Sequence, residues 1–147
     1  MKQKTLNFGH KDDYSVKNLY KSTCNEIAIN FINEWPKTTI NNNIFCIYGP
    51  SGSGKTHISK VWMEKSNAII FNGISDLSFD YLSGFDRNLI FEDIALNKNW
   101  PENLLFEFIN EIKSSRLSLL ITCNSDPLKI KWKTKDLISR FTSFTNI

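Results

Sequence analysis

This sequence of 147 residues lacks long apolar runs, and no two of its cysteines have the close spacing of a metal or redox motif. No stretch approaches the roughly 18 consecutive apolar residues of a membrane-spanning helix, and the first residues are polar. The three cysteines are an odd number, and two of them, Cys46 and Cys123, stand inside apolar runs, as small hydrophobic residues do. We therefore expect a reduced, cytoplasmic protein with no membrane segment.

A strong excess of either charge is also missing. The formal net charge is +3, which by itself is too small to indicate binding to nucleic acid or to a membrane surface. Arginine is scarce and occurs only at Arg87, Arg116 and Arg140. The length suits one compact domain. We expect an extended arm over residues 1–22, which has no clear periodicity, and a folded core over residues 23–147.

Short apolar runs alternate with helical patterns along the core. Strands are expected over residues 44–48, 68–71, 89–91 and 117–122, with a fifth beginning in the last residues. Helices are expected after Asn25, within the loop that follows the first strand, from Pro101 in a first-turn position, and over residues 134–141. In the first of these helices, Ile27, Ala28, Phe31 and Ile32 fall at helical spacing and are expected to form its buried stripe. Strands that alternate with helices predict a parallel sheet with helices on both faces.

A phosphate-binding loop (P-loop) follows the first expected strand. The sequence there fits the pattern G-x-x-x-x-G-K-[ST] in full, and it also opens a helix, which a chance run of glycine and serine need not do. Backbone N–H groups and the helix dipole would hold phosphate oxygens, Lys55 would reach the β- and γ-phosphates, and Thr56 would bind Mg²⁺. The sequence thus predicts an ATP or ADP site with magnesium. Its loop residues are Gly49, Pro50, Ser51, Gly52, Ser53, Gly54, Lys55 and Thr56.

Polar residues follow three later elements. Glu92 and Asp93 end the 89–91 strand as a Walker B pair, in which the first would face the metal and the second could orient an attacking water. Asn124 could hydrogen-bond a γ-phosphate or that water, although a turn-forming asparagine is the simpler alternative. Arg140 could act in trans as an arginine finger, a guanidinium that one molecule inserts beside another's nucleotide; the alternative is a surface arginine.

These features occur in the order found in AAA+ ATPases. The Gly-Lys-Thr-His run ending at His57 resembles the initiator DnaA and its relatives, and adds His57 to the nucleotide-binding residues. Asn18-Leu19 with Asn25 resembles the N-terminal nucleotide-binding box of that family. Residues 50–57, Val61-Trp62 and Phe91-Glu92-Asp93 are most similar to Hda-type proteins of alphaproteobacteria, which are regulatory homologues of DnaA without its DNA-binding domain. The resemblance implies an α/β P-loop NTPase fold of the AAA+ type, a three-layer sandwich around about five parallel strands.

The N-terminal arm contains Gln3-Lys4-Thr5-Leu6-Asn7-Phe8, which matches Q-x-x-L-x-F, the peptide that docks on the bacterial sliding clamp (DNA polymerase III beta subunit). Gln3 would orient the arm, while Leu6 and Phe8 would fill an apolar pocket. In this family a clamp-bound protein, usually holding ADP, promotes ATP hydrolysis by DnaA. The resemblance therefore implies a regulator of replication initiation with weak ATPase activity at most. Its partners would be the clamp and DnaA, with possible self-association, and Arg140 would be the finger.

Two departures from the family stand out. The sequence ends at Ile147, before the helical lid domain and its sensor-2 arginine, and its Walker B pair is Glu-Asp rather than Asp-Asp or Asp-Glu.

A DnaC-type helicase loader, which is a self-sufficient AAA+ ATPase acting on replication complexes, is the alternative function. The lysines of residues 129–135 predict a solvated loop, an electropositive rim at a partner interface or a weak DNA contact. No helix-turn-helix follows, so sequence-specific DNA binding is not expected.

Overall fold

The structure is a computed structural model that describes residues 25–39, 42–74, 86–97 and 99–147. The expected arm with Gln3, Leu6 and Phe8 lies outside the described residues, as does the Asn18-Leu19 pair. Among the described residues, no helix is both long enough and apolar enough to cross a membrane.

The described chain is built around a parallel sheet of five strands in the order β2-β3-β4-β1-β5. The strands are β1 (Ile44–Tyr48), β2 (Ile69–Phe71), β3 (Leu89–Phe91), β4 (Leu119–Cys123) and β5 (Thr145–Asn146). Pairing of β1 with β4 runs without a break from Ile44 opposite Leu119 to Tyr48 opposite Cys123. The two strands therefore end at the same level, and the loops that follow them emerge side by side.

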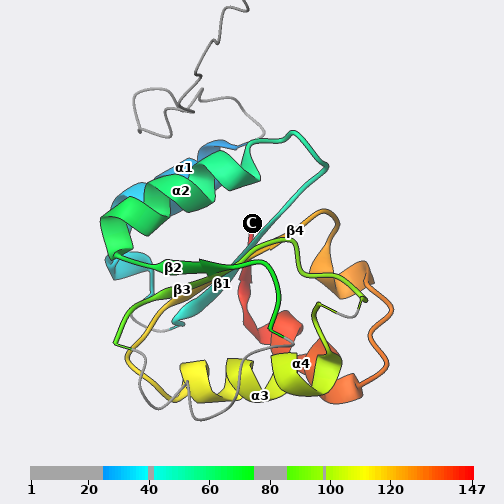
Figure 1. Ribbon diagram of the computed structural model, residues 1–147. Helices are drawn as coiled ribbons and strands as arrows, with labels where there is room; N and C mark the ends of the chain where they lie inside the picture. The colour runs from blue at the N-terminus through cyan, green and yellow to red at the C-terminus, as the bar shows by residue number, and fades with distance from the viewer. Residues whose placement is uncertain (1–24, 40–41, 75–85, 98) are drawn as a thin grey trace, which may run out of the picture.

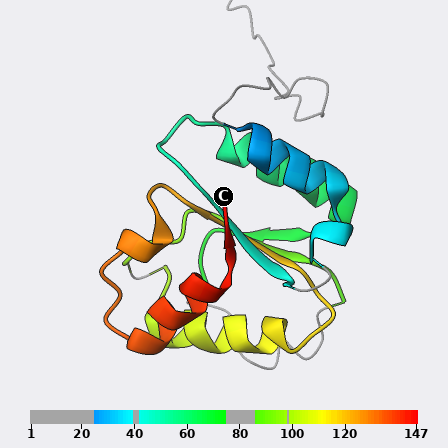
Figure 2. The same cartoon turned by 180° about the vertical axis from the view of Figure 1, so that it is seen from behind.

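Helices cover both faces of this sheet. Helices α1 (Glu26–Glu34) and α2 (Lys55–Ser66) lie on one face, and α3 (Glu102–Lys113) and α4 (Lys135–Ser143) lie on the other (Figures 1 and 2). Two short 3₁₀ helices, η2 (Lys37–Thr39) and η4 (Pro127–Lys129), complete the described elements. The predicted three-layer α/β arrangement with about five parallel strands is confirmed.

Each face of the sheet has its own apolar core, which explains why the strands are continuous apolar runs. Alternate residues of β1 enter opposite cores: Phe45 packs edge-on against Trp62 of α2, while Cys46 lies on the α3 and α4 side. The Cys46 thiol lies 3.7 Å from that of Cys123, and both cysteines are fully buried and free. Burial raises the pKa of the Cys46 thiol, as expected for a cysteine that serves as a small hydrophobic residue.

An asparagine sets the start of the central strands. The Asn43 side-chain amide donates hydrogen bonds to the carbonyls of Ile112 and Leu117, at 2.7 and 2.8 Å. The backbone carbonyl of Asn43 accepts from the N–H of Leu119 at 2.9 Å. One residue before β1 thus holds the end of α3, the following turn and the start of β4 together. This contact fixes the alignment of β4 with β1.

Three details differ from the sequence prediction. Ile27 was expected in the buried stripe of the first helix, but its side chain is 71% exposed, and Ile29 is buried instead. The stripe therefore runs one residue further round the helix than the sequence suggested. The fourth strand begins two residues later than expected, at Leu119. Pro101 precedes the first turn of α3 rather than standing within it, and its carbonyl accepts from the N–H of Leu105.

Candidate functional site

The loop between β1 and α2 has the tight, left-handed backbone conformation that its glycines predict. Gly52 and Gly54 adopt φ values of +81° and +94°, a left-handed conformation that a residue with a Cβ rarely adopts. At Gly49 the reason is space, because a Cβ there would lie only 3.0 Å from the Ser53 Oγ. Helix α2 starts immediately after Gly54, so its positive end adjoins the loop.

Lys55 is held by the loop that it serves. Its side chain is only 7% exposed, and its ammonium donates hydrogen bonds to the carbonyls of Gly49 and Pro50, with Nζ to oxygen distances of 2.7 and 3.0 Å. The loop is thus wrapped around a positive charge. A phosphate entering the loop would take up one or more of these hydrogen bonds.

A cavity of about 280 Å³ lies between the loop and the ends of the neighbouring strands. The strand ends converge because β1, β3 and β4 run in register, and the Gly49 N–H donates to the carbonyl of Cys123 at 3.1 Å. We call this hollow the phosphate cavity; it is lined by Ser51, Gly52, Gly54, Lys55, Thr56, Asp93 and Asn124. The fold therefore brings together most of the residues that the sequence singled out, from three separate segments.

The two Walker B carboxylates lie in different environments. Glu92 is 6% exposed, and its oxygens accept hydrogen bonds from the hydroxyls of Ser59 and Thr122. Asp93 is exposed and lines the phosphate cavity, with a φ of +54°. Both also line an adjoining hollow of about 170 Å³ that includes Thr56. Sequence reasoning did not single out Ser59 or Thr122, because a lone hydroxyl residue in a helix or strand carries no motif.

These residues fit a magnesium ion bound together with phosphates. Thr56, Glu92 and Asp93 offer only oxygen atoms, which Mg²⁺ prefers, and Mg²⁺ usually takes one or two protein carboxylates and completes its shell with phosphate and water. Among the described residues, no group of three or more His, Cys, Asp or Glu side chains could hold a metal without such help. The expected metal ligands remain a prediction.

A larger, mostly apolar cavity of about 430 Å³ adjoins the loop on its other side. It is lined by residues from α1, β1, α2 and the end of the chain: Asn25, Ala28, Ile47, Tyr48, Gly49, Pro50, Ser53, Lys55, Ile58 and Ile147. Apolar walls with few polar groups suit a flat aromatic ring such as a nucleobase. The sequence predicted only Asn25 and the loop here, because the other residues come from elements that share no local motif.

His57 and Arg140 are predicted site residues that do not line the phosphate cavity. His57 is half-buried in the first turn of α2 and is not among the residues that line the cavity. Arg140 lies on α4, where its guanidinium carbon is 5.7 Å from the centroid of the Phe106 ring of α3. In this chain Arg140 therefore does not reach its own phosphate cavity. Its role as an arginine finger in trans remains a prediction.

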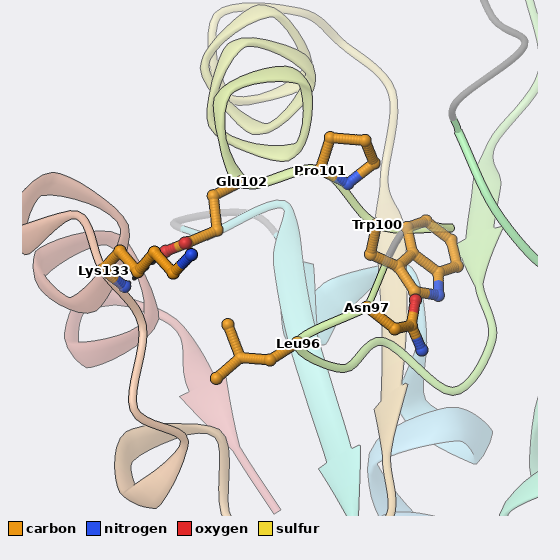
Figure 3. Close-up of a pocket in the computed structure, with 6 residues that line it drawn as sticks. All are labelled: Leu96, Asn97, Trp100, Pro101, Glu102 and Lys133. Atoms are coloured by element: carbon orange, nitrogen blue, oxygen red, sulfur yellow. Dashed lines mark hydrogen bonds between the residues drawn. The ribbon is translucent and has the colours of Figure 1, made fainter.

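The lysine-rich segment is exposed, and one of its residues, Lys133, lines a further hollow. Lys129, Lys131, Lys133 and Lys135 are all exposed, which agrees with a solvated loop. Glu102 of α3 accepts hydrogen bonds from the N–H groups of Lys133 and Thr134, at 2.7 and 3.2 Å, and so ties the start of α4 to α3. Figure 3 shows the Glu102 carboxylate beside Lys133 in this hollow of about 300 Å³, which is lined by Leu96, Asn97, Trp100, Pro101, Glu102 and Lys133.

Comparison with known proteins gives the fold a name. No protein-family model matches the chain. The chromosomal replication initiator DnaA of Aromatoleum aromaticum is 29% identical over an alignment of 121 residues, with a coverage of 67% of this chain and 25% of that protein. AMPPCP-bound DnaA from Aquifex aeolicus superposes with a TM-score of 0.72 at 19% identity, covering 92% of this chain and 50% of that one. DnaI superposes with a TM-score of 0.58 at 13% identity, covering 88% and 83%.

The chain thus spans about a quarter of the length of the curated relatives that it matches. The predicted α/β P-loop fold of the AAA+ type is confirmed by the structural matches, which cover nearly all of the chain. The chain therefore has the same fold as the DnaA structures on which it superposes.

Proposed function

We propose that the chain binds ATP or ADP with Mg²⁺, and that it regulates replication initiation by binding the sliding clamp and promoting ATP hydrolysis by DnaA. The observation that carries the nucleotide proposal is the phosphate cavity, where Lys55, Thr56, Asp93 and Asn124 meet from three segments. The AMPPCP bound to a DnaA of the same fold supports it. The regulatory proposal has further support from the sequence: the similarity to DnaA and the clamp-type peptide of the arm.

Each part of the nucleotide has a fitting place. Backbone N–H groups at the start of α2 and the Lys55 ammonium would hold the phosphates, and the apolar cavity on the other side of the loop would take the base. Thr56 with Glu92 and Asp93 would hold Mg²⁺, which when bound offsets the negative charge of the phosphates. Asn124, exposed at the end of β4, would face the terminal phosphate or the attacking water.

Turnover by the isolated chain should be slow. Arg140 packs against Phe106 rather than lining its own phosphate cavity, so a dilute monomer would lack a finger. An arginine finger raises the rate by on the order of 10³–10⁵ in other NTPases. We therefore expect phosphate release from ATP to stay near background over hours in dilute protein. Rapid hydrolysis whose specific rate does not depend on protein concentration would contradict a finger supplied in trans.

The proposed function is tested by measuring hydrolysis of ATP already bound to DnaA. We expect the wild-type chain to accelerate it only when the sliding clamp is present. Arg140→Ala should reduce this acceleration by about 10³-fold or more, whereas nucleotide binding by the variant should stay intact. Because Arg140 also stacks on Phe106, a melting curve accompanies the assay.

Arg116→Ala is the matched control, since Arg116 is exposed in the turn that follows α3. The Arg116→Ala variant should accelerate ATP hydrolysis by DnaA as much as the wild type does. Full acceleration by the Arg140 variant would refute the finger, and absence of any effect of the wild type on DnaA would refute the regulator.

A helicase-loader function is the second candidate, and the likeness in fold to DnaI favours it. A self-sufficient loader would hydrolyse ATP without DnaA and would bind a replicative helicase rather than the clamp. Pull-down of the chain with purified clamp in one reaction and purified helicase in another separates the two functions.

A further inference from the structure

We propose that Ser59 and Thr122 are positioning residues of the nucleotide site. Their hydroxyls hold Glu92 in place, and Thr122 also fixes the backbone of Asp93, so that Asp93 is the carboxylate that directly meets the nucleotide's magnesium. This inference rests on the proposed binding of nucleotide with Mg²⁺. It exchanges the roles that the sequence predicted, in which Glu92 would face the metal and Asp93 would orient a water.

Glu92 has hydrogen-bond donors at both oxygens. Its side chain is buried, with Ser59 bonded to Oε1 and the Thr122 hydroxyl 3.2 Å from Oε2. Both hydroxyl residues are themselves fully buried. A buried carboxylate is retained only when its oxygens have partners, and here hydroxyl groups fill that role. Each oxygen keeps a second lone pair, but Glu92 is only 6% exposed and, unlike Asp93, it does not line the phosphate cavity.

Ser59 connects this carboxylate to the P-loop helix. Ser59 lies on α2 three residues after Thr56, and its hydroxyl, which has one proton to donate, is within hydrogen-bond distance of both the Thr56 carbonyl oxygen, at 3.0 Å, and Glu92 Oε1. Glu92 is therefore tied to the turn of α2 that presents the Thr56 hydroxyl. This arrangement suits a group that supports the metal ligands from behind, as outer-shell partners do.

Thr122 links Glu92 to Asp93. Its Oγ1 accepts a hydrogen bond from the Asp93 N–H at 2.9 Å, so the hydroxyl proton is free to go to Glu92. The Thr122 carbonyl also accepts from the N–H of Ile94 at 3.0 Å. One buried residue of β4 thus holds two successive residues of the segment that follows β3.

The hydrogen bond between the Asp93 N–H and Thr122 supports an unusual backbone conformation at Asp93. Its φ of +54° lies in the left-handed region, which residues other than glycine adopt infrequently and which occurs often at functional sites. In this conformation Asp93 lines both the phosphate cavity and the adjoining hollow, and Thr56 lines both with it. Asp93 is also exposed, so its carboxylate can adjust to a metal without breaking into the core.

The test measures how much magnesium strengthens nucleotide binding. Affinity for a fluorescent ADP analogue is titrated with Mg²⁺ and again with EDTA, and the ratio of the two dissociation constants is the magnesium gain. Both dissociation constants are measured on the same variant, so a partial loss of folded protein affects both equally and cancels in their ratio. The informative variants are Thr122→Val, which keeps the shape but loses the hydroxyl, and Thr122→Ser, which keeps the hydroxyl. Ser59→Ala, Asp93→Asn and Glu92→Gln complete the set.

We expect Thr122→Val to lower the magnesium gain by about 10-fold or more, the range seen when outer-shell partners of a metal are removed. Thr122→Ser should restore it, Ser59→Ala should lower it, and Asp93→Asn should lower it more than Glu92→Gln does. Ser66→Ala is the matched control and should keep the wild-type gain. Ser66 is likewise buried on α2, and its hydroxyl donates to the Trp62 carbonyl at 2.6 Å, at the other end of the helix.

Two results would overturn the inference while leaving nucleotide binding intact. One is a wild-type magnesium gain in both Thr122→Val and Ser59→Ala. The other is a larger loss in Glu92→Gln than in Asp93→Asn, and this comparison still decides the question if Thr122→Val does not fold. If the wild-type chain binds no nucleotide under any condition, the proposed function fails and this inference fails with it.

Discussion

Lys55→Ala is expected to abolish measurable binding of ATP and ADP. Among the described residues that line the phosphate cavity, Lys55 carries the only positive charge. Charge-assisted hydrogen bonds contribute about 1.5–3 kcal/mol each, so losing one or two to the phosphates lowers affinity by roughly one to four orders of magnitude. The loss should appear for both nucleotides, because both place a β-phosphate in the loop. Titration calorimetry at high ligand concentration measures it.

Lys113→Ala is the control for charge. Lys113 is exposed in the last turn of α3, on the opposite side of the sheet from α2, so its removal changes the net charge by the same amount without touching the loop. The melting temperature of Lys55→Ala should change little, since the carbonyls of Gly49 and Pro50 can turn to water. Equal affinity of Lys55→Ala and the wild type would refute the assignment of the loop.

The double substitution Leu6→Ala, Phe8→Ala is expected to abolish binding to the sliding clamp. Each of these side chains contributes about 1.5–3 kcal/mol when fully buried in a partner. Losing both removes about 3–6 kcal/mol at most, enough to erase a micromolar interaction. Retention of the chain on immobilised clamp is the measurement. Nucleotide affinity should be unaffected, because the described lining of the phosphate cavity comes from the P-loop, Asp93 and Asn124.

Asn7→Ala is the control within the same peptide, since position 7 is one of the unspecified positions of Q-x-x-L-x-F. It should leave clamp binding unchanged. If Leu6 and Phe8 instead pack against the domain, the double variant will melt at a lower temperature and clamp retention will not change. If the wild-type chain is not retained by the clamp, the regulator proposal loses its main support, while the AAA+ fold stands.

The fold was largely predictable because its strands are buried on both faces. Such strands are short runs without polar interruption, and β1 and β3 were predicted to the residue. The phosphate loop was predictable for a different reason, since its glycines are required by the local backbone at Gly52 and Gly54. In both cases the determining interaction lies within a few residues of the chain.

Features that depend on packing between distant elements were not predictable. The exposure of Ile27 follows from how α1 is rotated against the sheet, which the local pattern does not fix. The contact of Arg140 with Phe106 joins α4 to α3, and the partners of Glu92 come from α2 and β4. The sequence alone does not distinguish Thr122 from any other threonine in an apolar strand, because its partners lie on another segment.

Asn43 has a consequence for the chemistry at the opposite end of the sheet. A slip of β4 by one residue against β1 would exchange the faces of Thr122 and Cys123. A thiol would then stand where the hydroxyl contacts Glu92 and Asp93, and Asn124 would move by about one residue's rise of 3.3 Å. Asn43, which aligns the starts of β1 and β4, therefore also helps to set the positions of Thr122 and Asn124 at the candidate site, one strand length away.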